Sequence, residues 1–185
     1  MALNEKSKPE DYPEIDFSHD LLRRHVLITD KKILQDLSKI DADWENQIAA
    51  FETRHQLDKS IALSNVSSQK ALIRSRIKIE QLDSSEKEQI LLAEKECDLD
   101  QVKLEMKFKL EKCTFLCNLS LEMTSRKMNA KNLTGVEKKY LREISEEGIK
   151  FVIDKTKSDI ECYLAQKKLE IEKKWTEEKL QLDEK

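Results

Sequence analysis

Residues 33–51, ILQDLSKIDADWENQIAAF, carry the clearest periodicity of this chain. Their apolar side chains recur at steps of four and three residues, which is the spacing of one face of an α-helix. The stripe consists of Ile33, Leu37, Ile40, Trp44, Ile48 and Phe51. Continued at the same step it reaches His55, Val66 and Ile77, so equivalent positions recur every eleven residues. Eleven residues make three turns at ~3.67 residues per turn, and the pattern therefore predicts a long, nearly straight helix.

The same period of eleven returns in the last part of the chain. One series is Ile149, Ile160, Ile171 and Leu182, and a second is Ile153, Leu164 and Trp175. A shared period favours packing of the two segments against each other or along a common track. Trp44 and Trp175 both occupy stripe positions, where a bulky indole usually anchors a helix contact or a protein interface. We interpret His55 in a similar way, as a histidine of the helix seam.

Residues that break helices are scarce in this sequence. No proline follows Pro13, and the only glycines are Gly135 and Gly148. Charged residues make up 38% of the chain and apolar residues another 38%, in narrow stripes. Such a helix buries little surface by itself, so its stability has to come from a second helix or a second chain. We therefore predict an elongated all-α protein with hendecad-like apolar stripes, built as a coiled coil or a helical hairpin.

The sequence divides into five segments. They are an extended acidic arm at 1–17, a short helix at 18–28, a long helical segment at 29–125, a basic turn at 126–134 and a long C-terminal helix at 135–185. The long segment has candidate joints near 64–68 and 83–85, where small polar residues gather. Ser85 with Glu88, and Thr134 with Glu137, match the capping box that begins a helix.

The stretch 102–123 gives conflicting signals. Apolar and polar side chains alternate there, which is the pattern of a β-strand. Its residues are mostly leucine, methionine, lysine and glutamate, with few β-branched side chains and no turn chemistry between the alternating runs. We favour a helix with a broad apolar face that contacts more than one neighbour, and we keep the strand as the alternative.

The residues that catalysis requires do not gather in the sequence. The two glycines lie far apart, and no phosphate-binding, metalloprotease or nucleophile-elbow motif occurs. Cys113 and Cys117 lie one helical turn apart, but neither a CxxC pair nor a nearby histidine completes a zinc site. We interpret the four cysteines as reduced structural residues, and we predict no enzymatic activity, no cofactor and no metal site.

Two groups of side chains are candidates for contact with partners. Tyr12, Ile15 and Phe17 lie on the acidic arm, which is either a disordered tail or an extended segment that docks on a partner. Around the predicted turn, six basic residues are opposed locally only by Glu137. They are either solvated charges or a contact for an acidic polymer surface such as tubulin tails, acidic lipids or, last, RNA. The full set of candidate partner-binding residues is Tyr12, Ile15, Phe17, Trp44, Phe51, Arg126, Lys127, Lys131, Lys138, Lys139, Arg142 and Trp175.

Charge and hydropathy narrow the class of partner. A net charge of −3 gives no global case for binding nucleic acid. No apolar run approaches the ~20 residues of a transmembrane helix, and the N-terminus lacks the apolar core of a signal peptide. We therefore expect a cytoplasmic protein with protein partners, self-association included.

The composition resembles that of small coiled-coil proteins of cilia, centrosomes and other cytoskeletal assemblies. The likeness is generic and carries over no residue role. Our leading hypothesis is a structural protein that binds other helices or a cytoskeletal filament, such as a microtubule-associated scaffold of the axoneme or a centrosomal assembly. Two alternatives remain open: a homodimeric coiled-coil adaptor in trafficking or signalling, and a non-catalytic stalk subunit of a larger complex.

Overall fold

Long helices make up the computed structural model, in keeping with the scarcity of proline and glycine. The structure describes residues 31–79 and 82–183. Its helices are α2 (Lys31–Ile79), α3 (Ser84–Ala130) and α4 (Gly135–Asp183). They contain 49, 47 and 49 residues, so each is ~70 Å long at ~1.5 Å per residue. None of these described helices has a stretch long and apolar enough to cross a membrane.

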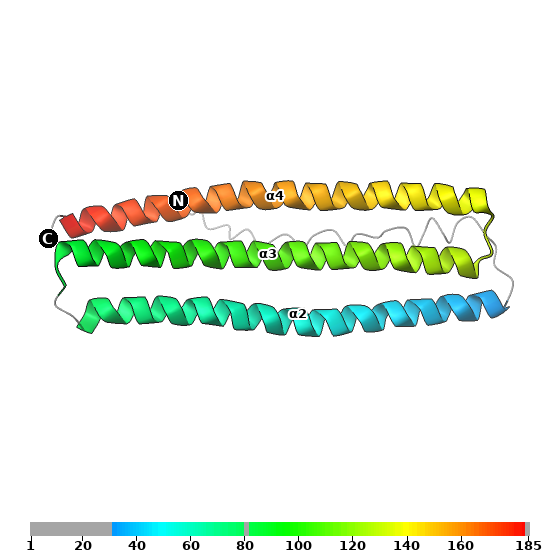
Figure 1. Ribbon diagram of the computed structural model, residues 1–185, viewed down its shortest axis with the longest axis horizontal. Helices are drawn as coiled ribbons and strands as arrows, with labels where there is room; N and C mark the ends of the chain where they lie inside the picture. The colour runs from blue at the N-terminus through cyan, green and yellow to red at the C-terminus, as the bar shows by residue number, and fades with distance from the viewer. Residues whose placement is uncertain (1–30, 80–81, 184–185) are drawn as a thin grey trace, which may run out of the picture.

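The described helices lie side by side in one elongated layer, with α3 in the middle (Figure 1). α3 contacts α2 along one side and α4 along another, and α2 and α4 do not contact each other. Successive helices run antiparallel, so the start of α2, the end of α3 and the start of α4 meet at one end of the layer. The prediction of an all-α protein is confirmed, and the part of the chain that the structure describes contains no strand.

The alternating stretch 102–123 belongs to α3, so the strand alternative is wrong. Residues two apart on a helix lie ~200° apart, and therefore on nearly opposite sides. α3 needs apolar side chains on two such sides because it packs between two helices. Met106 and Phe108 are two residues apart and both buried, and the same holds for Cys117 and Leu119. A period of two is here the pattern of a helix buried on two sides.

A capping box begins α3. Asp83 Oδ1 accepts a hydrogen bond from the backbone N–H of Glu86 at 2.8 Å, and Glu86 Oε2 accepts one from the backbone N–H of Asp83 at 3.0 Å. The expected box of Ser85 and Glu88 is therefore wrong by two residues. The Asp83 carboxylate serves as the cap, and Glu88 instead forms an ion pair with Lys179 of α4.

The segment expected at 29–125 divides at its second candidate joint, between α2 and α3. At the first candidate joint, 64–68, α2 continues without a break. The polar residues of that stretch are all exposed, and only Val66 is buried. Because serine and asparagine point to solvent there, their local preference for turns does not interrupt the helix.

The second reversal falls inside the predicted turn at 126–134, but it is shorter than expected. α3 continues to Ala130, and Asn132 then adopts a left-handed backbone with a φ of 52°, which asparagine tolerates. The predicted hydrogen bonds between Thr134 and Glu137 are present. The Thr134 N–H donates to Glu137 Oε2 at 2.9 Å, and the Glu137 N–H donates to Thr134 Oγ1 at 3.4 Å. Bonds from Thr134 lower the pKa of Glu137.

Ion pairs between α2 and α3 specify the antiparallel register. They are Asp41–Lys127, Asp43–Arg126, Glu52–Lys112, Lys70–Asp98 and Arg74–Glu94. The pairing residues of α2 are acidic in its first half and basic in its second, and α3 has the same order. Antiparallel packing therefore pairs opposite charges, whereas parallel packing would oppose like charges. Each exposed pair contributes only ~0.2–1 kcal/mol, so the pairs select the register more than they hold the helices together.

Apolar contacts between α2 and α3 contribute more stability per residue. The core cluster is Ile40, Leu119 and Met123, with Trp44, Ile48, Phe115 and Ala130 packed against it. Phe51 of α2 stacks on Phe115 of α3 with ring centroids 3.8 Å apart and planes 4° apart. Burying one large apolar side chain stabilises by ~1.5–3 kcal/mol, which exceeds the contribution of a surface ion pair.

We expect Met123→Ala to lower the free energy of unfolding by ~2–5 kcal/mol, because it leaves a cavity between α2 and α3. Met123 is 1% exposed. Urea titration followed by circular dichroism measures the change. Glu122→Ala is the control, since Glu122 is exposed and its loss should change this free energy by less than ~0.5 kcal/mol. Equal effects of the two substitutions would contradict the packing described above.

Candidate protein-binding surface

The outward side of α4 carries a row of exposed apolar side chains, which we call the α4 outer stripe. It consists of Val136, Tyr140, Ile144, Phe151, Leu169 and Leu180. Their exposed fractions range from 42% for Ile144 to 81% for Val136. Single exposed apolar residues are normal on a protein surface, but a row of them on one helix face indicates an interaction site.

The stripe lies opposite the side of α4 that packs on α3. Tyr140 and Ile149 are nine residues apart, and so are Phe151 and Ile160. Nine residues make two and a half turns at ~3.6 residues per turn. Ile149 and Ile160 are buried, whereas Tyr140 and Phe151 are exposed. Like α3, α4 is thus apolar on two opposite sides, but the described part of the chain covers only one of them.

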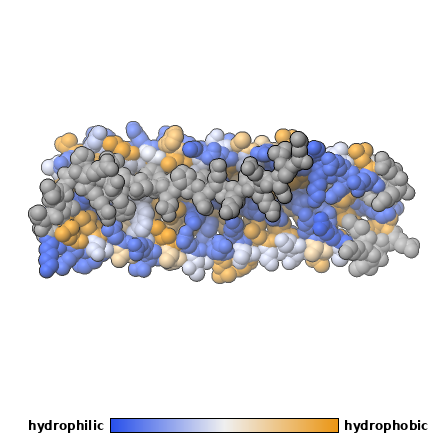
Figure 2. Space-filling model, turned by 180° about the vertical axis from the view of Figure 1, so that it is seen from behind, coloured by the Kyte–Doolittle hydropathy of each residue, from blue (hydrophilic) through white to orange (hydrophobic). Residues whose placement is uncertain are grey.

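Charged side chains beside the stripe are paired along α4. Lys139 pairs with Glu143 at 3.8 Å, and Arg142 pairs with Glu146 at 2.8 Å. Figure 2 shows apolar surface at intervals along the edge of the layer where α4 lies. A narrow apolar row bordered by such charges is typical of a seam between helices.

The other edge helix, α2, exposes a shorter apolar row. Leu57, Ile61 and Leu72 are exposed in its second half. Leu57 is nine residues from both Ile48, which packs against the core cluster, and Val66, which is buried. The row therefore also faces away from α3.

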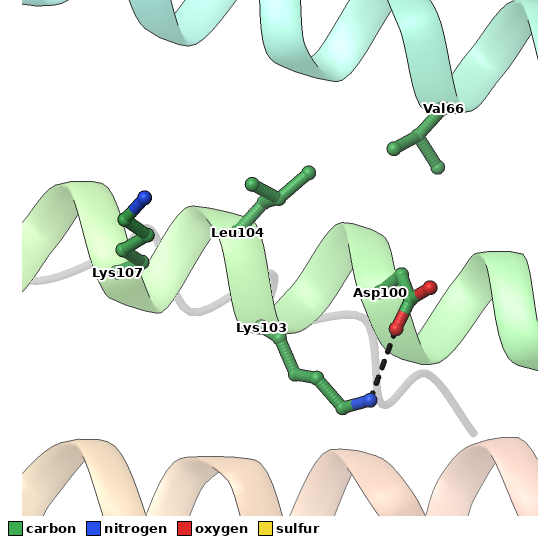
Figure 3. Close-up of a pocket in the computed structure, with 5 residues that line it drawn as sticks. All are labelled: Val66, Asp100, Lys103, Leu104 and Lys107. Atoms are coloured by element: carbon green, nitrogen blue, oxygen red, sulfur yellow. Dashed lines mark hydrogen bonds and ion pairs between the residues drawn. The ribbon is translucent and has the colours of Figure 1, made fainter.

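A pocket of about 400 Å³ lies between α2 and α3 (Figure 3). Val66 of α2 and Asp100, Lys103, Leu104 and Lys107 of α3 line it. Lys103 Nζ donates a hydrogen bond to Asp100 Oδ1 at 3.0 Å, so this carboxylate is engaged by its own helix. The lining contains no histidine, cysteine or serine beside its two lysines and one aspartate, and the α4 outer stripe is the stronger candidate site.

Three aromatic residues predicted to bind partners lie between the helices. Trp44 packs against the core cluster, and Phe51 belongs to the ring stack between α2 and α3. The ring of Trp175 lies 4.8 Å from Lys95 Nζ of α3 and 5.6 Å from Lys179 Nζ. Such contacts hold an aromatic ring between cations and stabilise the packing of α4 on α3.

The basic residues around the turn have more acidic neighbours than the sequence indicated. Glu137 is the only acidic residue near them in sequence, but in the structure Asp41 and Asp43 of α2 also pair with Lys127 and Arg126. The side chain of Lys127 is only 9% exposed. These carboxylates are distant in sequence, so inspection of the turn alone could not reveal them.

The other basic residues of this group also have neighbours that engage them. Lys139 and Arg142 form the pairs within α4 described above, and Lys138 Nζ donates a hydrogen bond to Asn129 Oδ1 at 3.2 Å. Burial, with the positive charge of Lys127 adding to it, lowers the pKa of Lys131. Arg126, Lys127, Lys138, Lys139 and Arg142 thus each have an acidic or amide partner among the described residues.

The sequence interpretation missed the α4 outer stripe. Its signal is a second apolar series, displaced by nine positions from the buried series that was recognised at Ile149 and Ile160. Tyr12, Ile15 and Phe17 lie outside the described residues, and so does the short helix expected at 18–28.

The cysteines differ in their surroundings. Burial raises the pKa of Cys117 to about 12, and the neighbouring Cys113 adds to the shift. Cys113 Sγ lies 3.4 Å from Thr156 Oγ1 of α4, whereas Cys162 is exposed. Within 31–79 and 82–183, no cluster of three or more histidine, cysteine or acidic side chains could hold a metal ion.

Comparisons with models of protein families, with characterised proteins and with solved structures find no match to this chain. Function is therefore inferred from the geometry of the chain itself.

We expect Lys127→Ala to lower the free energy of unfolding by ~1–3 kcal/mol, because it leaves Asp41 without its buried partner. Lys139→Ala is the matched control. The side chain of Lys139 is 79% exposed, so its loss should cost less than ~0.5 kcal/mol. Thermal or urea denaturation measures both. If the two variants unfold alike, the pair of Lys127 with Asp41 does not stabilise the fold.

We expect N-ethylmaleimide at neutral pH to modify Cys162 long before Cys117. The thiolate is the reactive form, and a pKa of about 12 keeps Cys117 protonated. The same shift makes a pH prediction. Because Cys117 has a higher pKa in the folded than in the unfolded protein, it contributes to the free energy of unfolding. This contribution is complete below the unfolded pKa of ~8.5 and is lost as the pH rises from there towards 12. Mass spectrometry of the labelled peptides measures the rates, and both cysteines should react alike in denaturant.

Proposed function

We propose that this protein is a non-catalytic structural protein that binds helices of other proteins along its edge helix α4. The observation that carries the proposal is the α4 outer stripe, an apolar row on the side of α4 that faces away from α3. Removing apolar surface of this kind from water is the main favourable contribution to the free energy of protein association.

The shape of the stripe favours a helical partner. It extends from Val136 to Leu180, which is ~66 Å at ~1.5 Å per residue, and it is narrow. Val136, Tyr140, Ile144 and Phe151 follow one another at steps of four, four and seven residues. A helix laid along α4 would meet several members of such a row at once, whereas a loop or a small ligand would cover only one or two of its side chains.

The form of assembly that we favour is a cytoskeletal scaffold, in a ciliary axoneme or a centrosomal structure. Long, nearly straight helices with an eleven-residue apolar period suit a repeating filament surface, and the composition supports the same class. In this proposal the protein resides in the cytoplasm. Its apolar stripes, which have a period of eleven residues, pack against helices of the complex as a coiled coil.

A homodimeric adaptor is the second candidate, because an apolar stripe on one edge helix can pair with the same stripe of a second copy. Size-exclusion chromatography with light scattering separates the two candidates. A defined dimer that becomes monomeric when the stripe is made polar supports the adaptor. A monomer in both cases supports the scaffold.

We expect the double substitution Tyr140→Ser and Phe151→Ser to weaken partner binding by at least ~30-fold, the equivalent of ~2 kcal/mol for one interface hot spot. The helical fold should remain, because both side chains are exposed. Proximity labelling in cells, with circular dichroism of the purified variants, measures the two effects.

The matched control is the double substitution Leu57→Ser and Leu72→Ser on α2. Leu72 is 67% exposed and Phe151 68%, so the two variants remove similar exposed apolar side chains from opposite edges of the layer. Labelled proteins that disappear with the α4 variant and persist with the α2 variant support the proposal. An unchanged set of labelled proteins in both would refute it.

A further inference from the structure

The α4 outer stripe changes in chemistry along its length. Most of its apolar members lie in its first part: Val136, Tyr140, Ile144 and Phe151. The longer part that follows, 152–180, adds only Leu169 and Leu180 to the stripe. A partner that follows the whole stripe therefore meets mainly other kinds of side chain beyond Phe151.

Two lysines lie on the line of the stripe in this second part. Continued from Phe151 at steps of four and three residues, the line runs through Lys155, Ser158, Cys162, Gln166, Leu169, Lys173, Thr176 and Leu180. All of these side chains are exposed. Lys155 and Lys173 are 18 residues apart, which is five turns at ~3.6 residues per turn, so both project in the same direction from α4.

Neither of these two lysines is engaged within the described part of the protein. The hydrogen bonds and ion pairs that join residues of 31–79 and 82–183 include neither Lys155 nor Lys173. By comparison, Lys157 on the same helix pairs with Asp154, at 3.9 Å. Because α4 lies at an edge of the layer (Figure 1), both ammonium groups are accessible to a partner on its outer side.

An acidic residue on the same line lies in the first part of the stripe. Glu147 is exposed between Ile144 and Phe151, eight residues before Lys155. Eight residues span ~12 Å at ~1.5 Å per residue, which is too far for an ion pair between these two side chains. The line of the stripe is therefore negative among its apolar residues and positive only beyond them.

A helix that lies over the second part of the stripe removes water from both ammonium groups. A buried charge without a counter-charge is costly, and a like charge opposite it costs more. Carboxylates of the partner at the same two heights offset this cost. These heights are ~27 Å apart at ~1.5 Å per residue, so a partner helix reaches both with acidic residues about 18 positions apart.

We propose that the partner of the α4 outer stripe is an acidic amphipathic helix. Its carboxylates lie opposite Lys155 and Lys173, and its apolar side chains lie against Tyr140, Ile144 and Phe151. This inference rests on the proposed function and specifies the chemistry of the helix that binds there.

A charge reversal tests the proposal in the full chain. We expect Lys155→Glu with Lys173→Glu to reduce the recovery of partner proteins in proximity labelling by at least ~10-fold, because carboxylates would then face carboxylates. Partner proteins are here those that Tyr140→Ser with Phe151→Ser removes from the labelled set. Circular dichroism should show unchanged helix content, since both lysines are exposed.

Lys150→Glu with Lys168→Glu is the matched control. These two lysines are also exposed and also 18 residues apart, but each lies five residues earlier in the chain. Five residues turn a helix by ~140°, so the control makes the same charge change away from the line of the stripe. We expect it to leave the labelled set unchanged.

The variants separate failure of this inference from failure of the proposed function. If the serine variant loses partner proteins and the Lys155 and Lys173 variant keeps them, the stripe binds a partner that is not acidic, and this inference is wrong. If neither variant changes the labelled set, the stripe binds no partner and both proposals are wrong.

Synthetic helices test the charge preference in solution. Two amphipathic peptides share one leucine seam and differ at two flanking positions, about 18 residues apart, which are glutamate in one and lysine in the other. We expect the glutamate peptide to bind the wild-type protein at least ~10-fold more tightly in fluorescence anisotropy, and Lys155→Glu with Lys173→Glu to reverse the preference. Equal affinities of the two peptides for the wild-type protein would overturn the proposal.

An acidic membrane and a second copy of this chain are the competing occupants of the stripe. Flotation with phosphatidylserine vesicles tests the first, and size-exclusion chromatography with light scattering tests the second. We expect neither flotation nor a dimer. Flotation or dimerisation that Tyr140→Ser with Phe151→Ser abolishes would assign the stripe to that occupant and would overturn the proposal.

Discussion

The requirement that α3 bury two opposite sides organises this structure. α2 and α4 each pack on α3 but not on each other, so among the described helices α3 alone joins the other two. Pairs such as Met106 and Phe108, two residues apart and both buried, meet this requirement. A helix with one apolar face could hold a single neighbour, and the layer would reduce to a hairpin of two helices.

The order of charged residues along α2 and α3 favours their antiparallel packing. Lys70 and Arg74 near the end of α2 meet acidic residues near the start of α3, while Asp41 meets Lys127 at the other end. These pairs contribute little individually, but together they make the parallel arrangement unfavourable, because it would bring like charges together. The apolar contacts then stabilise the register that the charges select. The ion pairs also explain why Arg126 and Lys127 of the turn are engaged within the protein, since their partners are acidic residues of α2.

The edges and faces of an open layer give it surfaces that a closed bundle would lack. The α4 outer stripe follows from the position of α4 at an edge, with apolar residues such as Phe151 on the side away from α3. A scaffold that binds helices at its edge is consistent with this feature.

Helix content was determined by the sequence itself, because it depends on local properties: scarce proline and glycine, apolar residues at helical spacing, and hydrogen bonds such as those of Thr134 with Glu137. Only tertiary structure decided which of two apolar series on α4 is buried, whether the period of two in 102–123 marks a strand, and which carboxylates meet Lys127. These outcomes depend on contacts between residues far apart in the chain. A helix with apolar residues on two sides satisfies local rules in either orientation, and its neighbours determine which side faces water.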